Sequence, residues 1–193
     1  LSSANFQISN GVLNIVSTDT RRLAMSGVPV FDSADGAGAL LPMKGIKEVQ
    51  RILSSLGSDS PVEILYDDAQ FYFKAESLEF TVRRVESRFP AYEKILPKGH
   101  LTSVSLDRGN LISALERVDV IVRDYNRMVV LDIVNGASLV MRGKAPDFGQ
   151  AMEEIPAEIS GEDLRIAVNS KFFMEALKVL RDPNVKLAFN GIS

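Results

Sequence analysis

The acidic side chains come closest to a catalytic arrangement in this chain. Asp67 and Asp68 are adjacent in the sequence. Paired carboxylates can hold a divalent metal ion. However, neighbouring residues of a strand point to opposite faces, so these two are poorly placed to share one ion. Two aspartates in a row are also typical of a turn. Asp19, near Arg21 and Arg22, is the other acidic position of interest. Metal-dependent turnover on nucleic acid therefore stays only an alternative.

Histidine and cysteine chemistry is almost excluded by composition. The 193 residues include no cysteine and one histidine, His100, which follows Gly99 in an expected loop. Without cysteine the chain forms no disulfide and has no thiolate nucleophile. A single histidine does not suit a multi-histidine metal site or a histidine-based triad. We therefore expect a non-enzymatic protein without cofactor or metal. The lack of cysteine fits a cytoplasmic location.

Basic side chains gather on one side of two expected helices. In a helix from Lys44 to about Leu56, the residues Lys44, Lys47 and Arg51 share one side at about 100° per residue. In a second helix, Lys171 and Lys178 share a face with Glu175 between them. One interpretation is an ordinary solvated face. The other is a surface that contacts phosphates without reading sequence. Because the net charge of the chain is −3, such a surface requires positive charge to be concentrated on one side.

These helices belong to an internal repeat of about 125 residues. A hairpin with an Asn-Gly turn is expected over residues 6–16 and again over 131–141, with turns at Asn10 and Asn135. The helices at Lys44 and Lys171 lie at nearly the same offset, and each precedes a strand, at 62–66 and 185–189. A further helix is expected over 107–122 and a further hairpin over 70–84. The pattern predicts an α+β fold with repeated units of two helices on antiparallel sheets.

The segment Arg88–Pro97 is a stiff apolar connector between the repeated units. Pro90 and Pro97 each remove a backbone donor and disfavour helix in the preceding residue. Phe89 and Tyr92 are expected to anchor the segment by burial. Because the chain begins with Leu1 rather than Met and the repeat is incomplete at both ends, it fits an internal piece of a longer protein. No apolar run approaches the length of a membrane span.

Four segments make the chain similar to the β subunit of bacterial DNA polymerase III, the sliding-clamp family. They are Val16–Ala24 (VSTDTRRLA), Leu41–Gly45 (LPMKG), Ser87–Pro97 (SRFPAYEKILP) and Val168–Lys171 (VNSK). The resemblance covers the whole chain in order and spacing. It implies the DNA-clamp fold, in which two subunits of three similar domains close into a ring around duplex DNA. It assigns residues 1–97 to the end of the second domain with its connector, and 98–193 to a third domain lacking its C-terminal strands.

The resemblance also implies functional residues. The basic helices become DNA-facing, with positions Lys44, Lys47, Arg51, Lys171 and Lys178. A pocket for linear peptides of partner proteins falls on Leu1, Thr18, Thr20, Arg21, Arg22, Leu23, Pro90, Lys94 and Ile95. Two of these depart from the family, which often has Gly where Thr20 stands and Arg where Lys94 stands. Ile121 and Val122 match apolar subunit-interface positions and are expected to be exposed here.

The expected function is therefore a processivity factor without catalytic activity. It would encircle duplex DNA as a homodimer and tether the polymerase III α subunit, the clamp loader and repair polymerases through their linear motifs. No membrane is expected among its partners. The alternative that stays open is a repeat-built protein-interaction scaffold without a DNA role.

Overall fold

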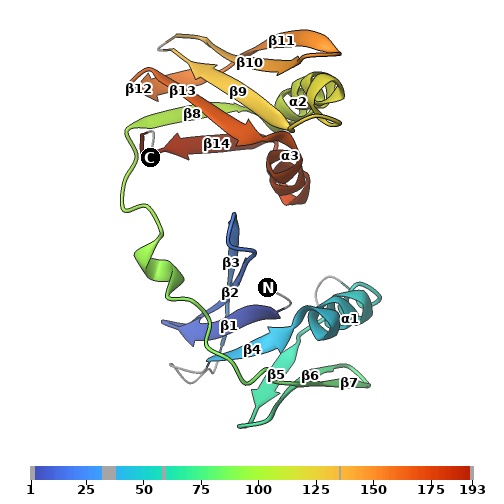
Figure 1. Ribbon diagram of the computed structural model, residues 1–193. Helices are drawn as coiled ribbons and strands as arrows, with labels where there is room; N and C mark the ends of the chain where they lie inside the picture. The colour runs from blue at the N-terminus through green and yellow to red at the C-terminus, as the bar shows by residue number, and fades with distance from the viewer. Residues whose placement is uncertain (1–2, 32–37, 58–59, 135, 192–193) are drawn as a thin grey trace. The chain divides into compact units, whose positions relative to one another are not determined.

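The computed structural model describes residues 3–31, 38–57, 60–134 and 136–191, and the chain divides into two compact units between Lys94 and Ile95 (Figure 1). Every strand pair in both units is antiparallel. Helices pack against these sheets, so the expected α+β class with repeated sheet units is confirmed.

The first unit contains a four-stranded sheet, a helix and a three-stranded sheet. The four-stranded sheet has the order β3-β2-β1-β4, and the other has the order β5-β6-β7. The elements are β1 (Ser3–Ser9), β2 (Val12–Thr18), β3 (Leu23–Pro29), β4 (Gly38–Pro42), α1 (Met43–Leu53), β5 (Glu63–Tyr66), β6 (Gln70–Ala75), β7 (Leu78–Arg83) and the short 3-10 helix η1 (Tyr92–Lys94).

The first hairpin forms as its turn residues predict. Ser9 pairs with Val12, so the loop holds two residues, Asn10 and Gly11, with φ of 52° and 69°. Asparagine and glycine tolerate this left-handed conformation, and the resulting turn matches the twist of the two strands. The hairpin over residues 70–84 is confirmed in the same way by the pairing of β6 with β7.

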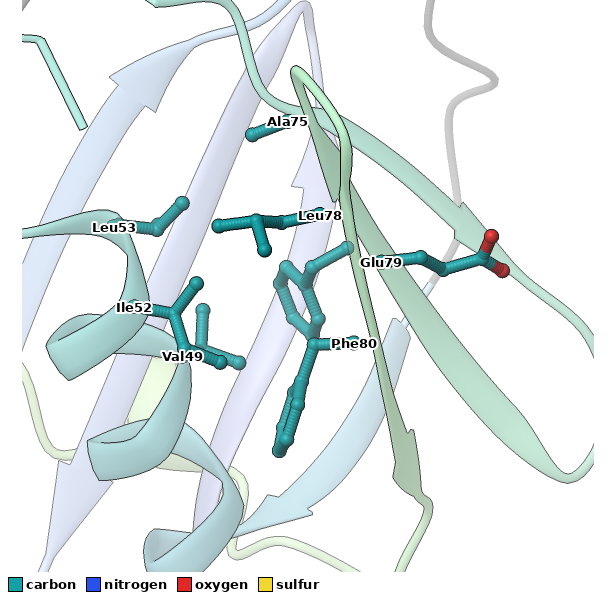
Figure 2. A pocket seen from close by; sticks show the side chains of 8 residues that line it. Val49, Ile52, Leu53, Ala75, Leu78, Glu79 and Phe80 are labelled. Atoms are coloured by element: carbon teal, nitrogen blue, oxygen red, sulfur yellow. The ribbon is translucent and has the colours of Figure 1, made fainter. Parts of the chain in front are cut away.

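The core of the first unit is aromatic. The ring of Phe6 meets those of Phe71 and Phe73 edge to face, with centroids 6.2 and 6.5 Å apart. Helix α1 buries Val49 against this cluster. Figure 2 shows the α1 side chains facing Leu78 and Phe80 of the β6–β7 hairpin across a hollow of about 40 Å³. Ligand sites usually enclose some 300–1,000 Å³, so this hollow is a gap in packing.

The second unit repeats the four-stranded sheet, the helix and the strand after it, and adds a strand and a helix before them and one further strand within them. Its sheets have the orders β11-β10-β9-β13 and β12-β8-β14. The elements are β8 (Thr102–Asp107), α2 (Arg108–Val122), β9 (Met128–Ile133), β10 (Ser138–Ala145), β11 (Gly149–Pro156), β12 (Glu158–Gly161), β13 (Leu164–Asn169), α3 (Ser170–Val179) and β14 (Asn184–Phe189).

Both helices of the second unit begin at a capping side chain. Asp107 accepts a hydrogen bond from the amide of Asn110 at 2.7 Å, and Asn169 accepts one from the amide of Phe172 at 3.2 Å. Each bond satisfies an amide that the first helical turn leaves without a partner. Helix α2 then packs on β10 and β11. The fully buried core here is aliphatic, without the aromatic cluster of the first unit.

Gly143 allows α2 to approach β10 closely. A Cβ atom at this position would lie 2.7 Å from Val118 Cγ1 and 2.9 Å from Val122 Cγ1. Both valines are fully buried. Real Cβ atoms essentially never lie under 3.0 Å from another heavy atom, so the spacing between helix and sheet depends on the missing side chain.

The internal repeat is confirmed by topology. The strands β1, β2, β3 and β4 take the same places in their sheet as β9, β10, β11 and β13. A helix follows the fourth strand in each case, and a strand follows that helix. One detail of the sequence prediction is wrong, since Ile133 pairs with Leu139 and the second hairpin loop is longer than two residues. Its turn residue Asn135 lies outside the described residues.

Candidate DNA-facing helices and peptide-binding loop

Helix α1 separates a basic side from an apolar side, as its sequence predicts. Lys44, Lys47 and Arg51 are exposed, whereas Val49 is buried and Ile46 is half-buried. No acidic residue stands in the first turn of the helix. The positive helix N-terminus therefore adds to the lysine charges, and the combination favours a polyanion on this side.

The three cations of α1 differ in availability. Arg51 donates from Nε to Glu48 Oε1 at 3.0 Å. This hydrogen bond raises the pKa of Arg51 above its usual value and lowers that of Glu48. Within the described part of the chain, neither Lys44 nor Lys47 has an ion-pair partner. The two lysines can therefore meet an external phosphate without giving up an internal bond.

Helix α3 presents a weaker basic side. Lys171 is exposed at its start. Lys178 lies near its end and forms an ion pair with Glu116 of α2, with Nζ 2.9 Å from Oε1. Both side chains of that pair are about half exposed, so it stabilises little and can exchange for another partner. The apolar residues at the end of α3 are only partly covered, because Leu177 is buried but Leu180, just after the helix, is 44% exposed.

The loop between β2 and β3 is held by its own side chains. The carboxylate of Asp19 accepts hydrogen bonds from the amides of Arg21 and Arg22, both at 3.1 Å, and from Arg22 Nε at 3.0 Å. The Arg22 hydrogen bond is the main cause of a lowered pKa for Asp19. The hydroxyl of Thr18 donates to the Arg22 carbonyl at 2.8 Å. Asp19 therefore stabilises the turn of this loop.

Thr20 sits at the tip of this loop with φ of 73°. A β-branched residue rarely adopts positive φ, because its side chain crowds the backbone. Glycine would adopt the same conformation without this crowding. Arg21 is exposed beside it. The side chain of Leu23 is half-buried at the start of β3.

The connector is anchored by one aromatic pair. Tyr92 is buried, Phe89 is half-buried, and their rings meet edge to face at 6.0 Å. Pro90 and Lys94 are exposed between and after these anchors, and Ile95 is 69% exposed. An aliphatic side chain of such exposure is available to a partner. The remaining position of the expected pocket, Leu1, lies outside the described residues.

The expected exposure of Val122 is wrong. Its side chain is fully buried under β10, while Ile121 is half-buried and Val120 is 55% exposed. The sequence carried a signal for this arrangement. The buried residues of α2 recur at helical spacing, namely Leu111, Ala114, Leu115, Val118 and Val122. Sequence reasoning missed Val120, which is the exposed apolar residue at this end of the helix.

The acidic pair is a turn. Asp67 Oδ1 accepts from the amides of Ala69 and Gln70 at 2.7 and 2.8 Å, and Oδ2 accepts from the Tyr72 hydroxyl at 2.8 Å. The amide of Ala69 is the main cause of the lowered pKa of Asp67. Among the described residues, no three acidic, histidine or cysteine side chains gather as a metal site. None of the described helices has the length and hydrophobicity to cross a membrane.

Two family models together match nearly the whole chain. The C-terminal domain of the DNA polymerase III beta subunit matches residues 93–193, and the central domain of the same subunit matches residues 1–91. The chain belongs to the DNA polymerase III beta subunit family. The resemblance on the four sequence segments is thereby confirmed.

Relatives within the beta subunit family are similar in sequence and fold. The beta sliding clamp of Synechocystis sp. is 29% identical over 98% of this chain. The beta subunit of Thermotoga maritima superposes with a TM-score of 0.91 at 28% identity over 99% of the chain. A sliding clamp of Pseudomonas aeruginosa bound to griselimycin gives 0.89 at 27% identity and 98% coverage. The chain spans about half the length of these relatives, 52%, 51% and 51% respectively.

Proposed function

We propose that this chain is the central and C-terminal part of a sliding clamp that encircles duplex DNA and carries no catalytic activity. The observation that supports this most directly is the basic side of α1, where exposed Lys44 and Lys47 have no ion-pair partner among the described residues. Contacts of this type bind phosphates without reading sequence, and salt weakens them. A topological ring needs only such weak contacts and can slide.

The proposed DNA-facing set comprises Lys44, Lys47, Arg51, Lys171 and Lys178. We expect the lysines of α1 to contribute most, because Arg51 and Lys178 each share their charge with an acidic neighbour. Removing one phosphate contact should lower the slope of log K against log salt by about 0.9. We therefore expect substitutions of Lys44 and Lys47 to weaken DNA binding more than substitutions of Arg51 and Lys178.

The proposed partner site comprises the Thr18–Leu23 loop and, as the family resemblance implies, the exposed connector residues Pro90, Lys94 and Ile95. The apolar members Leu23, Pro90 and Ile95 would each contact an anchoring side chain of a linear motif. Within the loop, the Thr18 hydroxyl donates to the Arg22 carbonyl and accepts from the Thr20 amide, so the group that the loop would present is the exposed hydroxyl of Thr20. Partners of this kind include the polymerase III α subunit, the clamp loader and repair polymerases. Tethering to a clamp on DNA raises their effective concentration there.

The ring itself is proposed as a homodimer of the longer protein. Residues 1–97 and 98–193 then belong to its second and third domains, and the end of α2 lies at the subunit interface. Ile121 stays in that interface proposal. Val120 replaces Val122 there, because a fully buried side chain does not reach a partner subunit.

The decisive experiment uses the longer protein that contains this chain, loaded by its clamp loader onto circular DNA. We expect retention on the circle and loss after linearisation. Lys44→Glu combined with Lys47→Glu should weaken binding of the unloaded protein to duplex DNA and flatten its salt dependence. Lys98→Glu combined with Lys186→Glu, at two exposed positions outside the proposed DNA-facing set, is the charge-matched control. Equal release from circular and linear DNA would overturn the clamp proposal and favour a scaffold without a DNA role.

The peptide site is tested separately by fluorescence anisotropy with a labelled Gln-Leu-rich clamp-binding peptide. Leu23→Lys and Pro90→Ala should each weaken binding, the former by about tenfold or more because it places a charge in the apolar wall. Leu65→Lys, at a 42% exposed position of β5, is the matched control. Unchanged affinity in both pocket variants, with the fold intact, would remove the site.

A further inference from the structure

A second concave surface lies on the outer face of the sheet β11-β10-β9-β13, opposite the face that α2 covers. Strand β9 alternates, so Val129 and Leu131 point into the core while Val130 and Asp132 point outward. Cross-strand pairing places Arg142 beside Val130 and Met152. We call this surface the basic–methionine hollow. Six side chains define it: Met128, Val130, Arg142, Lys144, Met152 and Arg165.

The hollow is large enough for a ligand. Its volume is about 610 Å³, within the usual range for binding sites. All of its residues belong to the second unit, and none is a residue of the proposed DNA-facing or peptide-binding sets. It is therefore a separate surface, independent of the proposed function.

The charges of the hollow are fixed by one central carboxylate. Asp132 Oδ2 lies 2.7 Å from Arg142 Nε, and Asp132 Oδ1 lies 3.1 Å from Arg165 Nε. Each guanidinium has five N–H donors, so this bridge orients both groups and leaves donors for a ligand. Lys144 has no ion-pair partner among the described residues. Three cations against one carboxylate leave the surface positive.

Apolar side chains lie among these charges. Met128 and Met152 are 48% and 57% exposed, and Val130 follows Met128 by two residues on the outward face of β9. Exposed methionines adapt to irregular partners and are over-used at promiscuous binding surfaces. Methionine and arginine are both enriched at protein interfaces. The mixture of flexible apolar groups and oriented guanidiniums fits a peptide with both an apolar anchor and carboxylates.

Nucleic acid fits this hollow less well. The cations of the hollow stand among the exposed apolar side chains of Met128 and Met152, which a phosphate backbone does not use. No aromatic side chain lines the hollow for base stacking. We propose that the basic–methionine hollow is a docking site for acidic linear peptides that carry an apolar anchor. A carboxylate of the peptide pairs with Lys144 and the free guanidinium donors, and the anchor packs on Met128 and Met152.

The chain offers a direct reporter for this proposal. It has six methionines, of which Met128 and Met152 line the hollow, Met141 is fully buried in the same unit, and Met25 lies in the first unit. The probe is a short peptide with Leu-Phe flanked on each side by glutamates. In methyl NMR of the full 193-residue chain with ¹³C-methyl methionine, the signals of Met128 and Met152 should shift on titration. That of Met25 should stay in place.

Substitutions with opposite signs sharpen the test. Lys144→Glu should weaken peptide binding about tenfold or more, and Asp132→Asn should strengthen it several-fold by removing the central negative charge. Lys186→Glu, at an exposed position of β14 in the other sheet, is the control and should stay within about twofold. An unshifted Met141 signal in each variant checks that the core is intact.

Three results would overturn the proposal. One is a set of methionine signals that the glutamate peptide leaves unmoved. Another is equal binding of a twin peptide with lysines in place of the glutamates, which would leave only apolar attraction. The last is a larger response of Met128 and Met152 to a duplex or single-stranded oligonucleotide than to the peptide, which would make the hollow a nucleic-acid site.

Discussion

Gly143→Ala tests the contact on which the second unit depends. The new Cβ would lie 2.7 Å from Val118 Cγ1 and 2.9 Å from Val122 Cγ1, whereas carbon atoms pack best at about 3.5–4.0 Å. The helix or the valines must therefore give way by nearly 1 Å. Valine in a helix has one strongly preferred rotamer, so neither side chain can turn aside cheaply. We expect the free energy of unfolding to fall by about 2 kcal/mol, within the ~1–3 kcal/mol range for overpacked cores.

The measurement is urea unfolding followed by far-UV circular dichroism, with the methyl signal of buried Met141 reporting the second unit. The control is Gly99→Ala, where an added Cβ has no neighbour within 4 Å; it measures the backbone-entropy effect of the change alone. Val118→Ala in the Gly143→Ala background should recover at least about 1 kcal/mol relative to additivity, because it empties the space that the new methyl needs. If Gly143→Ala were as stable as Gly99→Ala, helix and sheet would not be in the contact described.

Other changes probe the loop, an ion pair and the aromatic core. Thr20→Gly should stabilise the chain by about 0.5–1 kcal/mol in thermal unfolding, because relief of a left-handed threonine outweighs the added chain entropy; a lower midpoint would contradict the strain. Arg117 holds the pKa of Glu153 below its ordinary value through a hydrogen bond from Nε at 2.9 Å. This pair therefore stabilises the fold at pH values above the pKa of Glu153 in the unfolded chain, and the stabilisation is lost as the pH falls through the pKa of Glu153 in the folded chain. Arg117→Gln should therefore lower the free energy of unfolding at pH 7 and make it fall less steeply as the pH drops below about 4.5. An unchanged pH profile of stability would rule out this role of Arg117. Phe73→Ala should cost about 3–5 kcal/mol and weaken near-UV dichroism from the first unit, and a cost below about 1 kcal/mol would mean that the aromatic contacts add little.

Local chemistry made much of the fold predictable. The Asn10–Gly11 dipeptide specifies its own turn, and the alternation of apolar residues specifies the strands beside it. The repeat could be found because the same helix–strand order recurs at one offset. The loop at the second Asn-Gly could not be predicted, because its length follows from the pairing of Ile133 with Leu139 and that register depends on the whole sheet.

The site was predictable only as far as single elements determine it. The basic side of α1 follows from helical spacing within eleven residues. By contrast, Lys178 forms an ion pair with Glu116, which is 62 positions away in the sequence. Arg142 and Arg165 both contact Asp132 only because three strands pair in one sheet. Val122 was misplaced because its exposure was carried over from the family resemblance, although it follows Val118 by four residues and so lies on the same buried side of α2.

The two units differ in their content of buried aromatic side chains, and therefore in their optical signals. All aromatic side chains that are buried among the described residues, Phe6, Phe71, Phe73 and Tyr92, belong to the first unit. The chain has no tryptophan, and the second unit's tyrosine, Tyr125, is 58% exposed. Near-ultraviolet dichroism and tyrosine emission therefore report mainly on the first half, because the aromatic side chains packed against the core of the second half are partly buried phenylalanines. Two domains built to one plan can thus be followed separately in the same sample, by optics for the first and by methyl resonances for the second.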